Sequence, residues 1–85
     1  MDDGQQRMAP AEIAKGVIDQ LLADKGRPPA GLDQDLGEAG LSSLDIVNLM
    51  LALEDALDIA LPPDELTAAN FRTAKSIETM LARVV

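Results

Sequence analysis

The sequence predicts an all-α fold, a small antiparallel bundle of three main helices plus one short helix. Three segments carry apolar residues at helical spacing, and clusters of Gly and Pro separate these segments. The apolar residues make up 47% of the chain and are almost entirely aliphatic, since Phe71 is the only aromatic residue. Such a composition suits helix packing better than sheet packing. With 85 residues, the chain is expected to form one compact unit.

The first helix is expected to run from Pro10 to about Asp24. Pro10 suits the first helical position, where its missing N–H costs nothing, and Glu12 in the first turn complements the helix dipole. At about 100° per residue, apolar and polar side chains fall on opposite halves of this segment. The apolar half consists of Ile13, Val17, Ile18, Leu21 and Leu22. This segment is therefore an amphipathic helix with one buried face.

A long connection should follow, because Gly26 and Pro28-Pro29 stop the first helix. Residues 25–41 show no sustained periodicity, and long connections of this kind usually carry function. We expect Leu32, Leu36 and Leu41 to pin the connection onto the open side of the bundle.

The second helix gives the strongest helical signal and should extend from Ser42 to about Asp58, before Pro62-Pro63. It opens with Ser42-Ser43-Leu44-Asp45, in which Ser42 can cap the helix and Asp45 can bond back to it.

Two further threonines mark helix starts near the end of the chain. Thr67 is expected to cap a very short helix that ends at Asn70, and Thr73 to cap the last helix. The last helix carries apolar residues at the i, i+3, i+4, i+7 spacing of a buried face. These residues are Ile77, Met80, Leu81 and Val84.

The second helix has two apolar stripes, whereas a helix in a monomeric globular protein needs only one. The first consists of Ile46, Leu49, Met50, Leu53 and Leu57. It covers an arc of roughly 100°, the width of a buried face. The second consists of Leu44, Val47 and Leu51. Two interpretations are open. Either these residues pack under the connection or are scattered on the surface, or they form a docking surface steered by nearby carboxylates.

The acidic residues are unevenly distributed in a chain of net charge −8, because no Lys or Arg occurs between Arg27 and Arg72. Nine acidic residues lie there: Asp33, Asp35, Glu38, Asp45, Glu54, Asp55, Asp58, Asp64 and Glu65. A field of one sign repels nucleic acid and attracts basic docking surfaces, so no nucleic-acid partner is expected. The alternative is a surface that is acidic only for solubility.

Several functions are excluded by composition. The chain has no Cys and no His, which removes disulfides, thiolate or imidazole metal sites and Ser-His nucleophile pairs. Asp33 and Asp35 resemble the first ligands of a calcium loop, but Glu38 and Leu44 occupy the positions that require Gly and Glu. The N-terminus lacks signal-peptide features, and no apolar stretch reaches membrane-spanning length. We expect a cytoplasmic protein without catalytic residues, a metal site or membrane contact.

Two motifs flank the second predicted helix. The first is Asp35-Leu36-Gly37-Glu38-Ala39-Gly40-Leu41-Ser42-Ser43-Leu44-Asp45, and the second is Asp58-Ile59-Ala60-Leu61-Pro62. Together they resemble the phosphopantetheine-attachment region of acyl and peptidyl carrier proteins, which have Asp-Ser-Leu or a similar tripeptide at the start of this helix. Asn70-Phe71-Arg72-Thr73 also resembles the closing segment of peptidyl-type carriers. The resemblance spans roughly residues 10 to 84.

This resemblance implies that a phosphopantetheinyl transferase moves 4′-phosphopantetheine from coenzyme A onto Ser43. In the family, the attachment serine directly precedes a hydrophobic residue, which is Leu44 here. The thiol of the arm would hold an acyl or aminoacyl group as a thioester, received from a loading ligase and passed to a downstream transferase or synthase. The carrier itself would not be an enzyme. It would act as a monomer, with a flexible N-terminus over residues 1–9 and a carrier domain over residues 10–85. Partner enzymes would contact Leu44, Asp45, Val47, Asn48 and Leu51.

Two departures from the fatty-acid carriers bear on the subtype. Ser42 stands where those carriers usually have Asp, and Asn48 where they usually have Glu. Gly40-Leu41-Ser42-Ser43 is instead similar to stand-alone carriers that are charged with amino acids by ligases related to aminoacyl-tRNA synthetase cores. A polyketide, nonribosomal-peptide or specialised acyl carrier remains an alternative. Outside the family, the alternative is an unmodified acidic helical protein-interaction module, which would have no use for Ser43.

Overall fold

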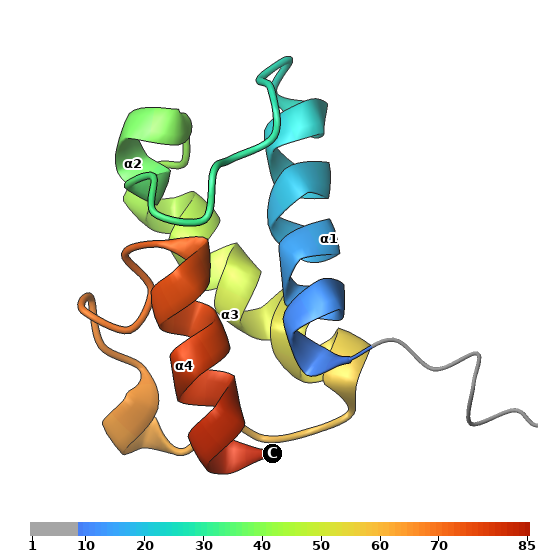
Figure 1. Ribbon diagram of the computed structural model, residues 1–85, viewed down its shortest axis with the longest axis vertical. Helices are drawn as coiled ribbons and strands as arrows, with labels where there is room; N and C mark the ends of the chain where they lie inside the picture. The colour runs from blue at the N-terminus through green and yellow to red at the C-terminus, as the bar shows by residue number, and fades with distance from the viewer. Residues whose placement is uncertain (1–8) are drawn as a thin grey trace, which may run out of the picture.

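The structure is a computed structural model that describes residues 9–85, and in this range every regular element is helical (Figure 1). The elements are α1 (Pro10–Asp24), α2 (Leu36–Ala39), α3 (Ser43–Leu57), the 3₁₀ helix η2 (Pro63–Glu65) and α4 (Ala74–Val84). Helix α1 packs against both α3 and α4 and runs in the opposite direction to them (Figure 1). The predicted all-α bundle of three main helices is confirmed. The predicted flexibility of residues 1–9 falls, apart from Ala9, outside the described residues.

Helix α1 has the predicted boundaries. The carboxylate of Glu12 accepts the backbone N–H of Ala9 at 2.9 Å, which satisfies a donor that the helix itself leaves free. At the other end, Gly26 adopts a φ of 74°, and the N–H of Arg27 donates to the carbonyl of Leu22 at 2.8 Å. A left-handed glycine followed by this bond is a common way of ending a helix. The glycine therefore turns the chain from α1 into the connection.

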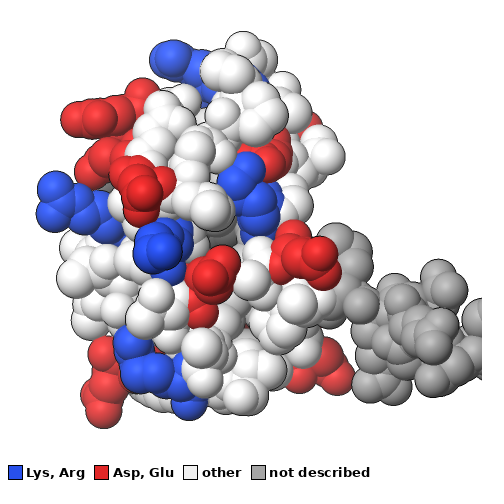
Figure 2. Space-filling view, viewed as in Figure 1, with Lys and Arg blue, Asp and Glu red and all other residues white. Residues whose placement is uncertain are grey.

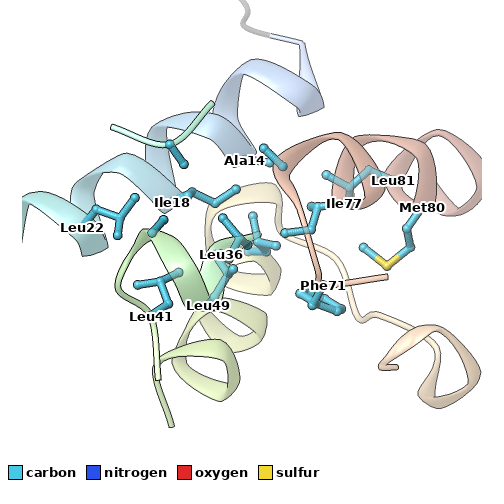
Figure 3. Close-up of a cluster of buried hydrophobic side chains, with 14 of the residues drawn as sticks. Ala14, Ile18, Leu22, Leu36, Leu41, Leu49, Phe71, Ile77, Met80 and Leu81 are labelled. Atoms are coloured by element: carbon cyan, nitrogen blue, oxygen red, sulfur yellow. The ribbon is translucent and has the colours of Figure 1, made fainter. Parts of the chain in front are cut away.

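The hydrophobic core lies between the three long helices (Figure 3). The helices contribute Ala14, Ile18, Leu22, Leu49, Leu53, Ala74, Ile77, Met80 and Leu81. The connecting segments contribute Ala30, Leu36, Ala39, Leu41, Leu61 and Phe71. The predicted inner stripe of α3 is confirmed at Leu49 and Leu53, while Ile46, Met50 and Leu57 are half-buried against the core. Among residues 9–85, no helix combines the length and apolar character needed to cross a membrane.

The connection after α1 is anchored differently from the prediction at one of three leucines. Leu36 and Leu41 are buried as expected, but the side chain of Leu32 is 52% exposed, so its predicted role was wrong. Ala30 takes the buried position instead. Leu32 is held by its backbone, because its carbonyl accepts the N–H of Lys75 at 3.0 Å. The side chain is therefore free to point outward.

The short helix α2 lies inside this connection and was not predicted. Asp35 caps it, since its Oδ1 accepts the N–H groups of Gly37 and Glu38 at 2.8 and 3.1 Å. Gly40 ends it with a φ of 128°. Four residues are too few to show helical periodicity, so only the capping Asp and the closing Gly could have indicated the helix.

The short helix predicted from Thr67 to Asn70 was wrong, because this segment forms a single turn. Thr67 does accept the N–H of Asn70 through its hydroxyl, at 3.2 Å. The side chain of Asn70, however, donates to the backbone carbonyl of Glu65 at 2.8 Å, which folds the chain back instead of continuing a helix. The brief helix lies earlier, at η2, where Pro63 starts it. Thr73 caps α4 as predicted, by accepting the N–H of Ser76 at 3.0 Å.

Candidate attachment site at the start of α3

Ser42 and Asp45 fix the beginning of α3 through reciprocal hydrogen bonds. The hydroxyl of Ser42 accepts the N–H of Asp45 at 3.2 Å. In return, Oδ2 of Asp45 accepts the backbone N–H of Ser42 at 2.8 Å and its hydroxyl at 2.9 Å. This is the predicted capping arrangement, and it is worth about 1 kcal/mol in a typical helix. Ser42 is therefore fully occupied in holding the helix start.

Ser43 is the first residue of α3 and is exposed. In the described part of the chain its hydroxyl takes part in none of the hydrogen bonds that hold the helix start. The N-terminus of a 15-residue helix also presents free N–H groups and the positive end of the helix dipole, both of which favour a phosphate. The position thus suits a serine that carries a phosphate ester.

A shallow apolar groove of about 300 Å³ runs from Ser43 along one side of α3. It is lined by Ser43, Ile46, Met50, Ala68 and Phe71. Two hollows of similar size lie along α1 and α4, away from Ser43. The groove beside Ser43 offers apolar surface to the chain of a flexible arm, so the residues present fit a phosphopantetheine group.

The second apolar stripe of α3 is exposed. Leu44, Val47 and Leu51 are 68%, 48% and 59% exposed, which rules out the interpretation that they pack under the connection. They form half of the six large apolar residues that are exposed within residues 9–85. Asn48 is exposed beside them. Clustering of apolar surface on one helix face is typical of an interaction site.

Asp45 does not lie among the outward-facing residues of this stripe. Its carboxylate receives the ammonium group of Lys25, with Nζ and Oδ2 separated by 2.5 Å. The bond from Lys25 and those from Ser42 lower the pKa of Asp45 to about 2. Lys25 follows the last residue of α1, so this ion pair ties the end of α1 to the start of α3. Sequence reasoning missed Lys25, because nothing local links residues twenty positions apart.

The predicted field of one sign is partly neutralised in the folded chain. Three of the nine central acidic residues pair with bases from outside the central stretch: Asp45 with Lys25, Asp35 with Arg72 at 3.6 Å, and Glu65 with Arg83 at 2.7 Å. The bonds from Arg83 and Asn70 lower the pKa of Glu65. On the face formed by α1 and α4, basic and acidic side chains are interspersed (Figure 2).

A helical bundle with an exposed serine at the head of α3 is the arrangement that the sequence resemblance to carrier proteins leads one to expect. Residues 16–81 match the family described as phosphopantetheine attachment site. The chain belongs to this family, and its prosthetic group is 4′-phosphopantetheine. The resemblance seen in the sequence is thereby confirmed.

Three proteins illustrate the similarity. Aminoacyl carrier protein 1 of Bradyrhizobium diazoefficiens is 37% identical over 71 residues, covering 82% of this chain and 74% of that protein. An acyl carrier protein of Syntrophobacter fumaroxidans is 39% identical over 74 residues, covering 85% of each chain. In the crystal structure of Bradyrhizobium japonicum glycine:[carrier protein] ligase complexed with glycylated carrier protein, one chain superposes with a TM-score of 0.76 and 32% identity, covering 84% of this chain and 96% of that chain.

Proposed function

We propose that this carrier bears 4′-phosphopantetheine on Ser43 and holds an amino acid as a thioester on the thiol of the arm. The observation that carries the proposal is the contrast between two adjacent serines. The hydroxyl of Ser42 is engaged in the hydrogen bonds of the helix cap. Ser43 is exposed, and its hydroxyl takes no part in the cap. Once attached, the arm supplies the thiol that a chain without Cys lacks. The chain contributes position and recognition and catalyses no step itself.

The proposed partners act in sequence on a monomeric carrier. A phosphopantetheinyl transferase attaches the arm, a ligase loads the amino acid, and a downstream transferase removes it. They contact the carrier through Leu44, Asp45, Val47, Asn48 and Leu51, on and beside the exposed stripe. Similarity to an aminoacyl carrier protein and to a chain from a complex with glycylated carrier protein supports an amino acid as cargo. We propose the cytoplasm as its site of action.

Attachment is tested by incubating the purified chain with coenzyme A and a broad-specificity transferase and recording the intact mass. The wild type and Ser42→Ala are expected to gain one phosphopantetheine group, and Ser43→Ala none. Ser42→Ala is the matched control, because it removes the neighbouring hydroxyl. An adduct that persists on Ser43→Ala contradicts the assignment. A wild type that never gains the group favours an unmodified interaction module.

Loading is tested on the arm-bearing protein with ATP, single amino acids and the Bradyrhizobium japonicum glycine:[carrier protein] ligase. A thioester should appear in the intact mass and disappear on treatment with hydroxylamine. Val47→Arg is expected to remain folded and lose loading at least tenfold, because a charge would enter the apolar contact. The control is Leu32→Arg, which alters an apolar residue of similar exposure on another face and should load normally.

A further inference from the structure

The exposed face of α3 divides into an uncharged part near Ser43 and an acidic part far from it. At about 100° per residue, Leu44, Val47, Asn48, Leu51 and Asp55 share one face of the helix. The first four carry no charge, and all five are exposed. Asp55 lies about 18 Å along the helix axis from Ser43, at a rise of about 1.5 Å per residue. Asp58 follows directly after the helix and is also exposed.

Asp45 is the only acidic residue among residues 43–50, and its charge is compensated inside the fold. Its carboxylate holds the ammonium group of Lys25 at 2.5 Å and two hydrogen bonds from Ser42. Only 18% of its side chain is exposed, against 38% for Lys25. A partner approaching the head of α3 therefore meets a neutral ion pair in place of a free carboxylate.

We propose that Lys25 masks the charge of Asp45 so that the loading ligase approaches Ser43 over an apolar, uncharged surface. The partner surface would be apolar opposite Leu44, Val47 and Leu51, and would carry Lys or Arg only opposite Asp55 and Asp58. The inference rests on the proposed function and refines the part that Asp45 plays in it. Its physical reason is that an unpaired carboxylate is costly to desolvate in an apolar contact, whereas a paired one costs less.

The opposite arrangement is a partner with basic groups aimed at Asp45. In that arrangement, Lys25 competes with the partner for the carboxylate, and removing Lys25 would strengthen the encounter. The two arrangements therefore predict opposite signs for the same substitution. Lys25→Met is the suitable change, because it keeps an unbranched apolar stem and removes only the charge and its hydrogen bond.

The experiment measures kcat/KM for glycylation of arm-bearing protein by the Bradyrhizobium japonicum ligase. Masking predicts that Lys25→Met lowers kcat/KM by roughly threefold to tenfold. Lys15→Met is the matched control, because Lys15 forms a comparable ion pair with Asp19, at 2.6 Å, within α1. It should stay within about twofold of the wild type. The double variant Lys25→Met/Asp45→Asn should recover most of the loss, since it restores neutrality.

The dependence of kcat/KM on salt distinguishes the effect of Lys25 at the start of α3 from the effect of the acidic residues at its end. The loss caused by Lys25→Met should persist when NaCl is raised from about 0.02 M to about 0.5 M, because desolvation within a contact is screened little. Asp55→Asn/Asp58→Asn should lower kcat/KM at low salt and match the wild type at high salt, because it removes steering charges on the surface. Asn is chosen at position 58 because it tolerates the left-handed backbone found there.

Each outcome decides the proposal. A rise in kcat/KM for Lys25→Met, or no change, overturns masking while leaving the carrier function intact. The double variant Lys25→Met/Asp45→Asn provides the second measurement, because it removes both charges of the ion pair. Under masking it should load better than Lys25→Met, whereas a loss at least as large as that of Lys25→Met shows that the ligase uses the charge of Asp45. If the arm-bearing wild type forms no glycyl thioester, the proposed loading and masking both fail.

Discussion

Gly40 lies close against the side chain of Arg27. A methyl group added at Gly40 would lie 2.9 Å from Cγ and 3.0 Å from Nε of Arg27, closer than side-chain atoms normally approach. Gly40 also adopts a φ of 128°, which L-residues with a side chain rarely reach. Because Gly40 ends α2 and Arg27 follows α1, this contact joins two segments that lead into α3. The approach to Ser43 therefore requires glycine at this position.

Gly40→Ala should destabilise the fold by about 1–3 kcal/mol, because alanine is strained in this backbone conformation and the exposed side chain of Arg27 would also have to move aside. The measurement is the free energy of unfolding in urea. Gly16→Ala is the control. Gly16 lies within α1 with no atom within 4 Å of the added methyl group, so alanine there should stabilise by about 0.5–1 kcal/mol. Equal effects of the two substitutions would contradict the role assigned to Gly40.

Asp58 ends α3 in a left-handed conformation, with a φ of 54°. The N–H of Ile59 then donates to the carbonyl of Glu54 at 3.1 Å, which closes the last turn. Asp58→Gly should raise the free energy of unfolding by about 0.5–1 kcal/mol, because glycine adopts this conformation without steric cost. Asp55→Gly, one turn earlier in regular helix, should lower it by a similar amount. Thermal and urea unfolding of both variants will show whether the signs differ.

Substitutions of Ser42 and Ser43 should differ in their effect on the free energy of unfolding, as they are expected to differ in their effect on attachment of the arm. Ser42→Ala removes a capping oxygen and should cost about 1 kcal/mol. Ser43→Ala removes an exposed hydroxyl that plays no part in the cap, and should change stability by less than about 0.5 kcal/mol. Urea unfolding of the unmodified proteins measures both. A large loss for Ser43→Ala would mean that its failure to carry the arm reflects misfolding.

The three long helices could be predicted because their signals are local. Pro10, Ser42 and Thr73 mark helix starts within one turn of the residues they affect, and the apolar spacing identifies the buried faces. The short elements could not be predicted in the same way. Helix α2 depends on a contact across the fold, because the N–H of Leu36 donates to the carbonyl of Arg72 at 2.8 Å. Leu32 is likewise placed by its backbone bond to Lys75 and not by its apolar side chain.

The candidate site likewise has parts that could be predicted from the sequence and parts that could not. Ser43 could be predicted from its place in the motif that resembles carrier proteins, and the exposed stripe of α3 from helical spacing, since its residues lie on one continuous helix. The ion pair of Lys25 and Asp45 requires the antiparallel arrangement of α1 and α3, which brings the end of one helix to the start of the other. The neutralisation of the central acidic stretch has the same origin, because its basic partners lie outside that stretch.

The stability contributed by Asp45 should disappear in acid. Its pKa is lowered from 3.8 to about 2 in the folded chain, first by Lys25 and then by Ser42. A folded pKa below the unfolded one stabilises the fold above about pH 4, and this contribution is lost as the pH falls towards about 2. The stability gap between the wild type and Asp45→Asn, measured by urea unfolding, should therefore be constant near neutrality and shrink between about pH 4 and about pH 2. Asp55→Asn is the control variant, because it removes one acidic residue from the same helix and leaves the ion pair of Lys25 and Asp45 intact. A gap for Asp45→Asn that stays unchanged down to about pH 2 would show that the ion pair contributes nothing to the fold.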